Sequence, residues 1–204
     1  MKAGIRFTIT NRNFNQIEEI FKIASENEIS RICFYHLISA GRAVDNNLKC
    51  NKEQVRSALN DILKYSELYS NRVNEVLTVG NHADGGYILS RLRREKPALF
   101  EKNYELMKKF GGNKIGTKIF AVDAGGEVHP DQFWRNFSMG NVTKQNLKEI
   151  LEKYFDIFSD KTILAPDRCK KCKWLKICGT NMRDGVLEPE CYLNGEEITQ
   201  PLRH

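Results

Sequence analysis

Four cysteines near the end of the chain have the spacing of a metal site. Three lie in the segment DRCKKCKWLKICG, residues 167–179, and one follows in EPECYL; they are Cys169, Cys172, Cys178 and Cys191. Thiolates are soft ligands that disfavour magnesium and calcium. Four of them fit either a tetrahedral zinc ion or a [4Fe–4S] cluster. The spacing C-x2-C-x5-C-x12-C therefore predicts a four-thiolate centre and leaves both metals open.

The residues between the cysteines favour an iron–sulfur cluster over zinc. Zinc ribbons pair one C-x2-C with a second C-x2-C or with two histidines, and this chain has a single C-x2-C. The intervening Trp174, Leu175 and Ile177 are bulky and apolar, and the potential of a cluster depends on its exclusion from solvent. Cys33 and Cys50 lie outside the spaced set, and we interpret both as structural.

Composition and charge limit the class of protein. The chain has 204 residues, 41% hydrophobic and 28% charged, which argues against disorder. It has no apolar run of about 18 residues, and its start, MKAGIRFTIT, lacks a secretion signal. We expect a cytoplasmic protein without a membrane partner, in which clustered cysteines bind metal. The net charge of +6 is the sole indication of nucleic-acid binding, which we rank last.

Strands and helices alternate in the first part of the chain. Segments 4–10, 31–37 and 74–80 are β-branched or apolar and predict strands. Apolar spacing predicts helices after a candidate N-cap, Asn13, and over residues 52–70. This α/β alternation favours parallel βαβ units, too few to close a barrel. The first strand has no preceding strand to cover its edge, so we expect a larger architecture.

The second part of the chain has a different pattern. A charged helical stretch is predicted at about 90–110 and a short helix at 144–158. KIFAVD and EVHPDQ flank AGG, which predicts a β-hairpin. GGNKIG and DAGG lack the spacing of phosphate-binding loops and are interpreted as turns. A composition shift at 111–113 predicts two domains, residues 1–110 and 111–204.

These motifs together resemble a known family. The cysteine run, with ICG at its third cysteine and CYL at its fourth, resembles the auxiliary iron–sulfur region of radical S-adenosylmethionine (SAM) enzymes with a SPASM or twitch-type domain. GNHADG at 80–85, GGNKIG at 111–116, and DAGGEVHPDQFW followed by MGNV are similar to the branch that modifies iron-tetrapyrroles in haem d1 and alternative haem biosynthesis. The resemblance covers about residues 4–198.

The resemblance implies a fold and a function. The fold would be the C-terminal half of a partial (β/α)6 radical SAM barrel, followed by a small SPASM/twitch-like domain with one auxiliary [4Fe–4S] cluster. The substrate would be an iron-tetrapyrrole. The family's C-x3-C-x2-C loop, which holds the SAM-cleaving cluster, is absent from the sequence. The chain would therefore bind SAM only when an N-terminal half, supplied by a protein partner, completes the barrel. The chain would not be catalytic alone. It would be a truncated reading frame or one product of a split gene.

Polar residues beside the predicted strands and hairpin are candidates for binding, although each also suits a local structural role. No catalytic residue is assigned. By the resemblance, the candidates for contact with the tetrapyrrole are His82, Asp84, His129 and Asp131, and those for the cofactor side of the barrel are Arg6, Thr8 and Thr10. The alternative interpretation is a non-catalytic four-cysteine module, with zinc or an iron–sulfur cluster, that docks on a partner.

Overall fold

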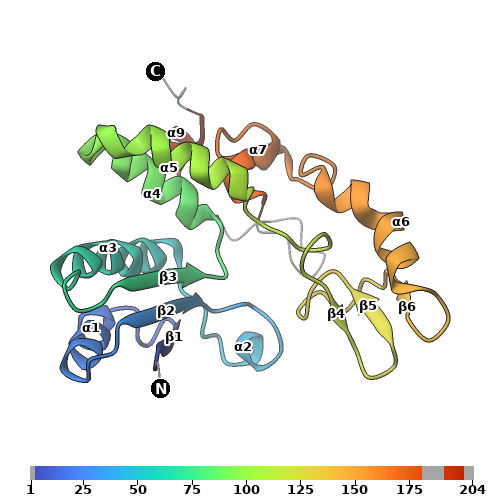
Figure 1. Cartoon of the computed structure of the whole chain (residues 1–204), viewed down its shortest axis with the longest axis horizontal. Coiled ribbons are helices and arrows are strands. Elements are labelled where there is room, and N and C mark those ends of the chain that lie inside the picture. The colour runs from blue at the N-terminus through green and yellow to red at the C-terminus, as the bar shows by residue number, and fades with distance from the viewer. Residues whose placement is uncertain (1–2, 181–190, 200–204) are drawn as a thin grey trace. The chain divides into compact units, whose positions relative to one another are not determined.

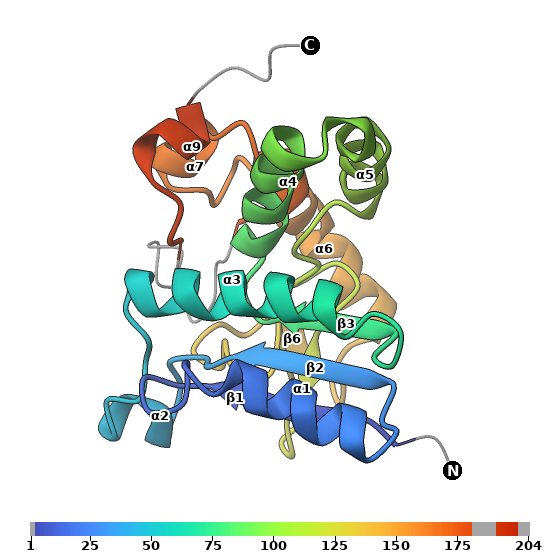
Figure 2. The ribbon, with the colours of Figure 1, turned by 90° about the vertical axis from the view of Figure 1, so that its left-hand side faces the viewer.

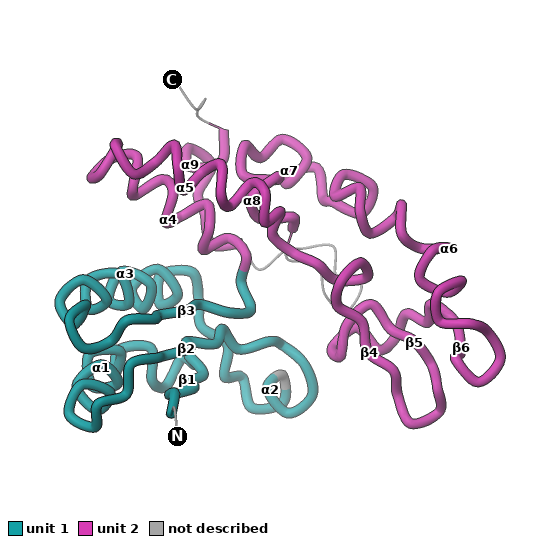
Figure 3. The backbone as a smooth tube through the Cα atoms, viewed as in Figure 1, with its two compact units in different colours: residues 1–81 teal, residues 82–204 magenta. Residues whose placement is uncertain are grey.

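The computed structural model describes residues 3–180 and 191–199, which form two compact units, 1–81 and 82–204 (Figure 1 and Figure 3). None of the described helices is long and apolar enough to cross a membrane. The units do not follow the predicted boundary at residue 110. Helices α4 (Ala83–Glu95) and α5 (Pro97–Phe110) pack against α8 (Leu175–Cys178) and so lie in the second unit. The domain boundary itself stays a prediction.

The first unit is a parallel sheet with the order β1-β2-β3. The strands are β1 (Ile5–Ile9), β2 (Arg31–His36) and β3 (Glu75–Val79). The predicted strands and their parallel pairing are confirmed, with boundaries correct to within one residue. The connections contain α1 (Ile17–Glu26), the short α2 (Arg42–Asp45) and α3 (Lys52–Leu68).

The helices α1 and α3 bury one face of this sheet, and Figure 2 shows them beside the three strands. The ring of Phe21 on α1 lies 5.7 Å from that of Phe34 on β2 and 6.1 Å from that of Tyr65 on α3. All three side chains are buried. The burial of one large apolar side chain contributes about 1.5–3 kcal/mol, so this cluster holds both helices on the sheet.

The start of α1 corrects one prediction. Asn13 does not cap the helix, which begins at Ile17. The Asn13 side chain instead accepts a hydrogen bond from the backbone N–H of Thr10 at 2.7 Å and donates one to the carbonyl of Thr8 at 3.0 Å. Asparagine commonly closes a turn on its own backbone, and here that turn delays the helix.

Both outer edges of the sheet are formed by β1 and β3. Within residues 3–180 and 191–199, β1 pairs with β2 alone and β3 likewise pairs with β2 alone. Parallel sheets are normally covered on both faces and closed or protected at their edges. That this sheet is part of a wider one stays a prediction.

The second unit combines helices with a small antiparallel sheet. The predicted helical stretch at 90–110 is two helices, α4 and α5, separated at Lys96. Pro97 lacks an N–H and crowds the preceding turn, so one continuous helix cannot form there. The remaining elements of this unit are β4 (Ala121–Val122), β5 (Glu127–His129), β6 (Gly140–Asn141), α6 (Leu147–Ser159), α7 (Asp167–Lys170), α8 and α9 (Gly195–Thr199).

The predicted hairpin is confirmed, and it carries a third strand. Ala121 pairs with His129 across the antiparallel pair β4 and β5. The sequence did not predict β6, which is two residues long and pairs with β5. A strand this short lacks the alternating pattern that identifies strands in a sequence. The helix expected at 144–158 is α6, which is capped by the side chain of Asn146.

The aromatic core of the first unit gives a stability prediction. Phe21→Ala removes a fully buried ring and should lower the free energy of unfolding by about 3–5 kcal/mol. Leu68→Ala, at a side chain that is 68% exposed in the same unit, is the matched control and should change it by less than about 0.5 kcal/mol. Urea unfolding followed by circular dichroism measures both. Equal effects of the two substitutions would contradict the packing described here.

Candidate metal centre

The four cysteines come from three short segments of the second unit. Cys169 lies in α7, Cys172 lies between the two short helices, and Cys178 is the last residue of α8. Cys191 is the first residue of the described C-terminal segment 191–199. All four side chains are partly buried, and none forms a disulfide.

A close backbone contact fixes the third cysteine. Gly112 has a φ of +61°, and a Cβ atom there would lie 2.2 Å from the carbonyl oxygen of Cys178. Only glycine fits this approach and this conformation. The backbone N–H of Asn113 donates to the same carbonyl at 2.9 Å, and the Asn113 side chain donates to the carbonyl of Thr180 at 3.1 Å. GGNKIG is therefore a turn, as predicted, and this turn brings Gly112 and Asn113 against the backbone of Cys178.

A second contact ties the cysteine segment to α4. Trp174 is 1% exposed and packs on Gly86, where a Cβ atom would lie 2.8 Å from the indole ring. Gly86 lies in the first turn of α4, which begins at Ala83 and so starts earlier than the helical stretch predicted at about 90–110. Sequence reasoning noted the bulk of Trp174 but missed its glycine partner, because the two are far apart in the chain.

The surroundings of the thiols affect their pKa values. Burial, with a smaller contribution from Cys191 and Cys172, raises the pKa of Cys169 to about 11. Burial also raises the pKa of Cys172 and that of Cys178, and the other three thiols raise the pKa of Cys178 further. The thiols are thus near enough to interact. Metal ligation requires thiolates, so loading would release these protons.

The chemistry of these residues fits a thiolate-bound cluster. The backbone N–H of Trp174 donates to the sulfur of Cys172 at 3.4 Å, and a backbone hydrogen bond from Thr180 lowers the pKa of Cys178 against the effect of burial. Hydrogen bonds to ligand sulfurs tune iron–sulfur clusters. Among the described residues, no group of three or more His, Cys, Asp or Glu side chains is arranged to hold a metal ion. The ligand set of four cysteines stays a prediction.

His82 and Asp84 lie at the start of α4, and they differ in their surroundings. His82 is partly buried, and its carbonyl accepts the N–H of Gly85 at 3.3 Å. Asp84 is 3% exposed, and its carboxylate accepts the hydroxyl of Tyr192 at 2.8 Å. Asp84 therefore faces the cysteine segment, and Tyr192, next to Cys191, is a site residue that sequence analysis missed. The CYL motif, which contains Tyr192, was the one feature of the sequence that could have pointed to this residue.

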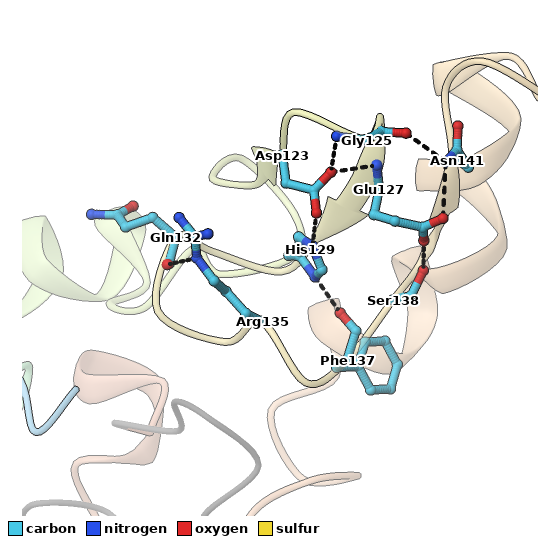
Figure 4. Close-up of polar contacts among 9 residues, drawn as sticks. All are labelled: Asp123, Gly125, Glu127, His129, Gln132, Arg135, Phe137, Ser138 and Asn141. Carbon is cyan, nitrogen blue, oxygen red and sulfur yellow. Dashed lines mark hydrogen bonds and ion pairs between the residues drawn. The ribbon is translucent and has the colours of Figure 1, made fainter. Parts of the chain in front are cut away.

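His129 and Asp131 both form hydrogen bonds within the hairpin region, and Figure 4 shows those of His129. His129 Nδ1 lies 2.9 Å from the carbonyl of Phe137, and Nε2 lies 3.5 Å from the carboxylate of Asp123. The Asp131 carboxylate accepts the backbone N–H groups of Phe133 and Trp134, each at 2.8 Å. Both candidates thus stabilise the loop after β5. Their predicted contact with substrate is untested.

Acidic side chains hold the turn of this hairpin. Asp123 accepts the N–H groups of Gly125 at 2.8 Å and of Glu127 at 3.0 Å, and the Glu127 hydrogen bond is the main reason that the pKa of Asp123 is lowered. Glu127 in turn accepts the hydroxyl of Ser138 and the amide of Asn141 (Figure 4). The hairpin region is therefore a rigid scaffold built from charge-assisted hydrogen bonds.

The cofactor-side candidates lie at the first strand. Arg6 and Thr8 alternate with Phe7, which packs into the helix-covered core, so they share the opposite face of the sheet. The Arg6 guanidinium lies 4.6 Å from the ring of Tyr35 on β2. Thr10 lies beyond the end of β1, where its hydroxyl accepts the N–H of Arg12 at 3.3 Å. The structure therefore places two of the three candidates on one strand face.

One cavity in the second unit has no cysteine among its lining residues. Its volume is about 320 Å³, and its lining residues are Gly116, Thr117, Leu147, Lys148, Leu151, Glu152 and Phe155. The lining combines apolar side chains with the charged side chains of Lys148 and Glu152. None of the four proposed cysteine ligands lines this cavity.

Comparison with known proteins defines the class of this chain. Residues 114–173, which include Cys169 and Cys172, match the SPASM family, an iron–sulfur cluster-binding domain. In its fold the chain is similar to Streptococcus suis SuiB, with a TM-score of 0.58 at 16% identity over 98% of this chain and 45% of that one. It is also similar to anSMEcpe with bound AdoMet, with a TM-score of 0.55 at 18% identity over 89% of this chain and 48% of that one. The resemblance to radical SAM enzymes with a SPASM domain is thereby confirmed.

Two relatives narrow the resemblance to the haem-forming branch. The chain is 38% identical to Fe-coproporphyrin III synthase of Methanosarcina barkeri, over 97% of this chain and 54% of the relative. It is 27% identical to pre-heme d1 synthase of Dinoroseobacter shibae, over 97% of this chain and 53% of the relative. The chain thus spans about half the length of the curated relatives it matches. The predicted branch is confirmed.

The Gly112 contact gives a prediction with a matched control in the same turn. Gly112→Ala drives a Cβ into the Cys178 carbonyl and should lower the free energy of unfolding by more than about 2 kcal/mol. Gly111→Ala shares the positive φ, at +71°, but meets only the flexible tip of Lys114, so it should show the conformational strain of about 1–2 kcal/mol alone.

Urea unfolding and the reactivity of the Cys178 thiol toward a maleimide measure this difference. The thiol should react faster in Gly112→Ala than in Gly111→Ala, since only the first change displaces the Cys178 backbone. Indistinguishable stabilities and reactivities of the two variants would refute the close backbone contact.

Proposed function

We propose that this chain is the C-terminal part of a radical SAM enzyme that modifies an iron-tetrapyrrole, and that it holds one auxiliary [4Fe–4S] cluster. The observation that carries the proposal is the 38% identity to Fe-coproporphyrin III synthase over 97% of the chain, with four interacting thiols at its C-terminal end. The proposed ligands are Cys169, Cys172, Cys178 and Cys191.

The residues around the thiols suit such a role. The cluster would supply electron transfer or substrate placement, because four thiolates leave no open iron position for SAM. The chain itself contributes a rigid frame, since the Gly112 turn and the packing of Trp174 on Gly86 position the cysteine segment. Partial burial of the thiols would exclude water from the centre.

The first unit supports the proposal of a partial (β/α)6 barrel. Its strands follow the order of the chain, and α1 and α3 bury the same face of the sheet. An open doubly wound sheet instead reverses its strand order and carries helices on both faces. In barrels the helices form an outer ring, and the opposite face, here with Arg6 and Thr8, faces inward. We propose that this inner face meets the cofactor.

The missing half of such a barrel would complete the activity. The 204 residues contain no C-x3-C-x2-C motif, so we propose that a preceding segment or a partner chain provides the SAM-cleaving cluster and the strands that pair with β1. His82, at the start of α4, is the first proposed contact with the tetrapyrrole. Asp84, His129 and Asp131 form hydrogen bonds to neighbouring segments, so we propose that they act on the substrate indirectly, by positioning those segments.

The metal content tests the proposal. Anaerobically reconstituted protein should contain about four irons and four sulfides per chain. Alanine at any one of the four proposed ligands should sharply reduce both. Cys50→Ala is the control, because Cys50 packs against the core of the first unit and should leave the metal content unchanged. Stoichiometric zinc without sulfide would instead support the four-cysteine module that docks on a partner.

Complementation tests the half-barrel. The purified chain with a strong reductant should form no 5′-deoxyadenosine from SAM, because it lacks the motif for the SAM-cleaving cluster. Co-expression with a polypeptide that carries the first barrel strands and C-x3-C-x2-C should yield a complex that forms it. A version of that polypeptide with its three cysteines replaced is the control. Turnover by the chain alone would refute this assignment of roles.

A further inference from the structure

A buried hydrogen bond joins the start of α4 to the residue next to Cys191. The hydroxyl of Tyr192 donates to the carboxylate of Asp84 at 2.8 Å, and the two side chains are 4% and 3% exposed. The ring of Tyr192 also lies 5.7 Å from that of Tyr87, one turn further along α4. Two polar groups are rarely buried together without a structural or functional reason.

Further contacts hold the C-terminal segment against the other cysteines. The N–H of Lys173 donates to the carbonyl of Ile198 at 3.1 Å, and the indole N–H of Trp174 donates to the carbonyl of Glu197 at 2.9 Å. Arg168 donates to the carbonyl of Leu193. These three donors lie within two residues of Cys169 or Cys172, so the segment 191–199 is fixed to the part of the chain that carries the first thiols.

We propose that Tyr192 and Asp84 are positioning residues for the fourth cluster ligand: their hydrogen bond holds Cys191 beside the other three thiols, and the charge of the Asp84 carboxylate helps to set the reduction potential of the centre. This inference rests on the proposed function, since it requires that the cysteines bind a cluster. Nothing in the resemblance to other proteins assigns a role to Tyr192.

The physical reason for an anchor is the distance along the chain. Twelve residues separate Cys178 from Cys191, and closing such a loop onto the cluster loses conformational entropy. With an anchor at the adjacent residue, this conformational entropy would be lost when the chain folds and not when the metal binds. A hydrogen bond to a carboxylate is stronger than one between neutral groups, and burial away from water makes it stronger still.

The carboxylate also has an electrostatic consequence. A fixed negative charge in a poorly polarisable interior opposes the addition of an electron nearby. Because Asp84 touches the residue that follows Cys191, its charge should stabilise the oxidised cluster. Replacement of this carboxylate by the neutral amide of Asp84→Asn should therefore raise the potential while the hydrogen bond to Tyr192 is kept.

Two variants separate the bond from the charge. Tyr192→Phe keeps the ring but removes the hydroxyl, and Asp84→Asn keeps an acceptor oxygen but removes the charge. Tyr154→Phe, in α6 of the same unit and remote in sequence from the cysteines, is the matched control. For each reconstituted protein, we would measure iron and sulfide content, cluster loss to a chelator, the EPR spectrum of the reduced centre and the midpoint potential.

The expected results differ between the variants. Tyr192→Phe should lose its cluster about tenfold faster than the control, the factor expected for a hydrogen bond to a charged group, and its EPR spectrum should change. Asp84→Asn should keep the cluster and shift the reduction equilibrium about tenfold toward the reduced form, which is about 59 mV for a one-electron couple. A merely structural role would alter apoprotein stability without moving the spectrum or the potential.

The outcomes distinguish this inference from the proposed function. Wild-type protein without iron and sulfide would overturn both. A wild-type cluster, with Tyr192→Phe equal to Tyr154→Phe in loss rate and spectrum, would overturn the positioning role alone. An unchanged potential in Asp84→Asn would overturn the electrostatic role. If Tyr192→Phe does not fold, Asp84→Ala, which removes the acceptor of the hydrogen bond, replaces it in the test of the loss rate and the spectrum, and Asp84→Asn still tests the charge.

Discussion

The approach of Gly112 to the carbonyl of Cys178 is the constraint on which the cysteine site depends. A side chain at residue 112 would occupy the space of the Cys178 backbone, so two segments that are distant in the sequence can meet only through glycine. The same turn ends α5, where Gly111 adopts the left-handed conformation. The end of a helix and the position of the third thiol are thus determined together.

Contacts that involve no sulfur atom build the rest of the site. Trp174 is buried against Gly86, its indole N–H reaches the C-terminal segment, and Tyr192 reaches Asp84. The thiols are consequently partly buried, and burial raises the pKa of three of them. If the four cysteines bind a metal as proposed, this hydrophobic and hydrogen-bonded frame holds them before the metal is bound. Metal binding then has less chain to order.

The hairpin and the sheet illustrate two different uses of polar residues. His129, Asp131 and Asp123 all point to groups within the hairpin region, where they stabilise a turn. Arg6 lies on the sheet face opposite the helices, over the ring of Tyr35. A residue type that suits binding is therefore informative only once its neighbours are known, because a loop can consume the hydrogen-bonding capacity of its own histidines and carboxylates.

The sequence by itself determined the features that depend on neighbouring residues. Runs of β-branched and apolar residues identified three strands, and their alternation with helices identified the parallel pairing. AGG identified the hairpin, and the cysteine run with its neighbouring motifs identified the resemblance to an iron–sulfur family. Only the tertiary structure decided that Gly86 packs against Trp174, why Gly112 is glycine, and that Asp84 is paired with Tyr192. The reason is physical. Periodicity and turn preference act within a few residues, whereas these contacts join segments that meet only after folding and leave no local pattern.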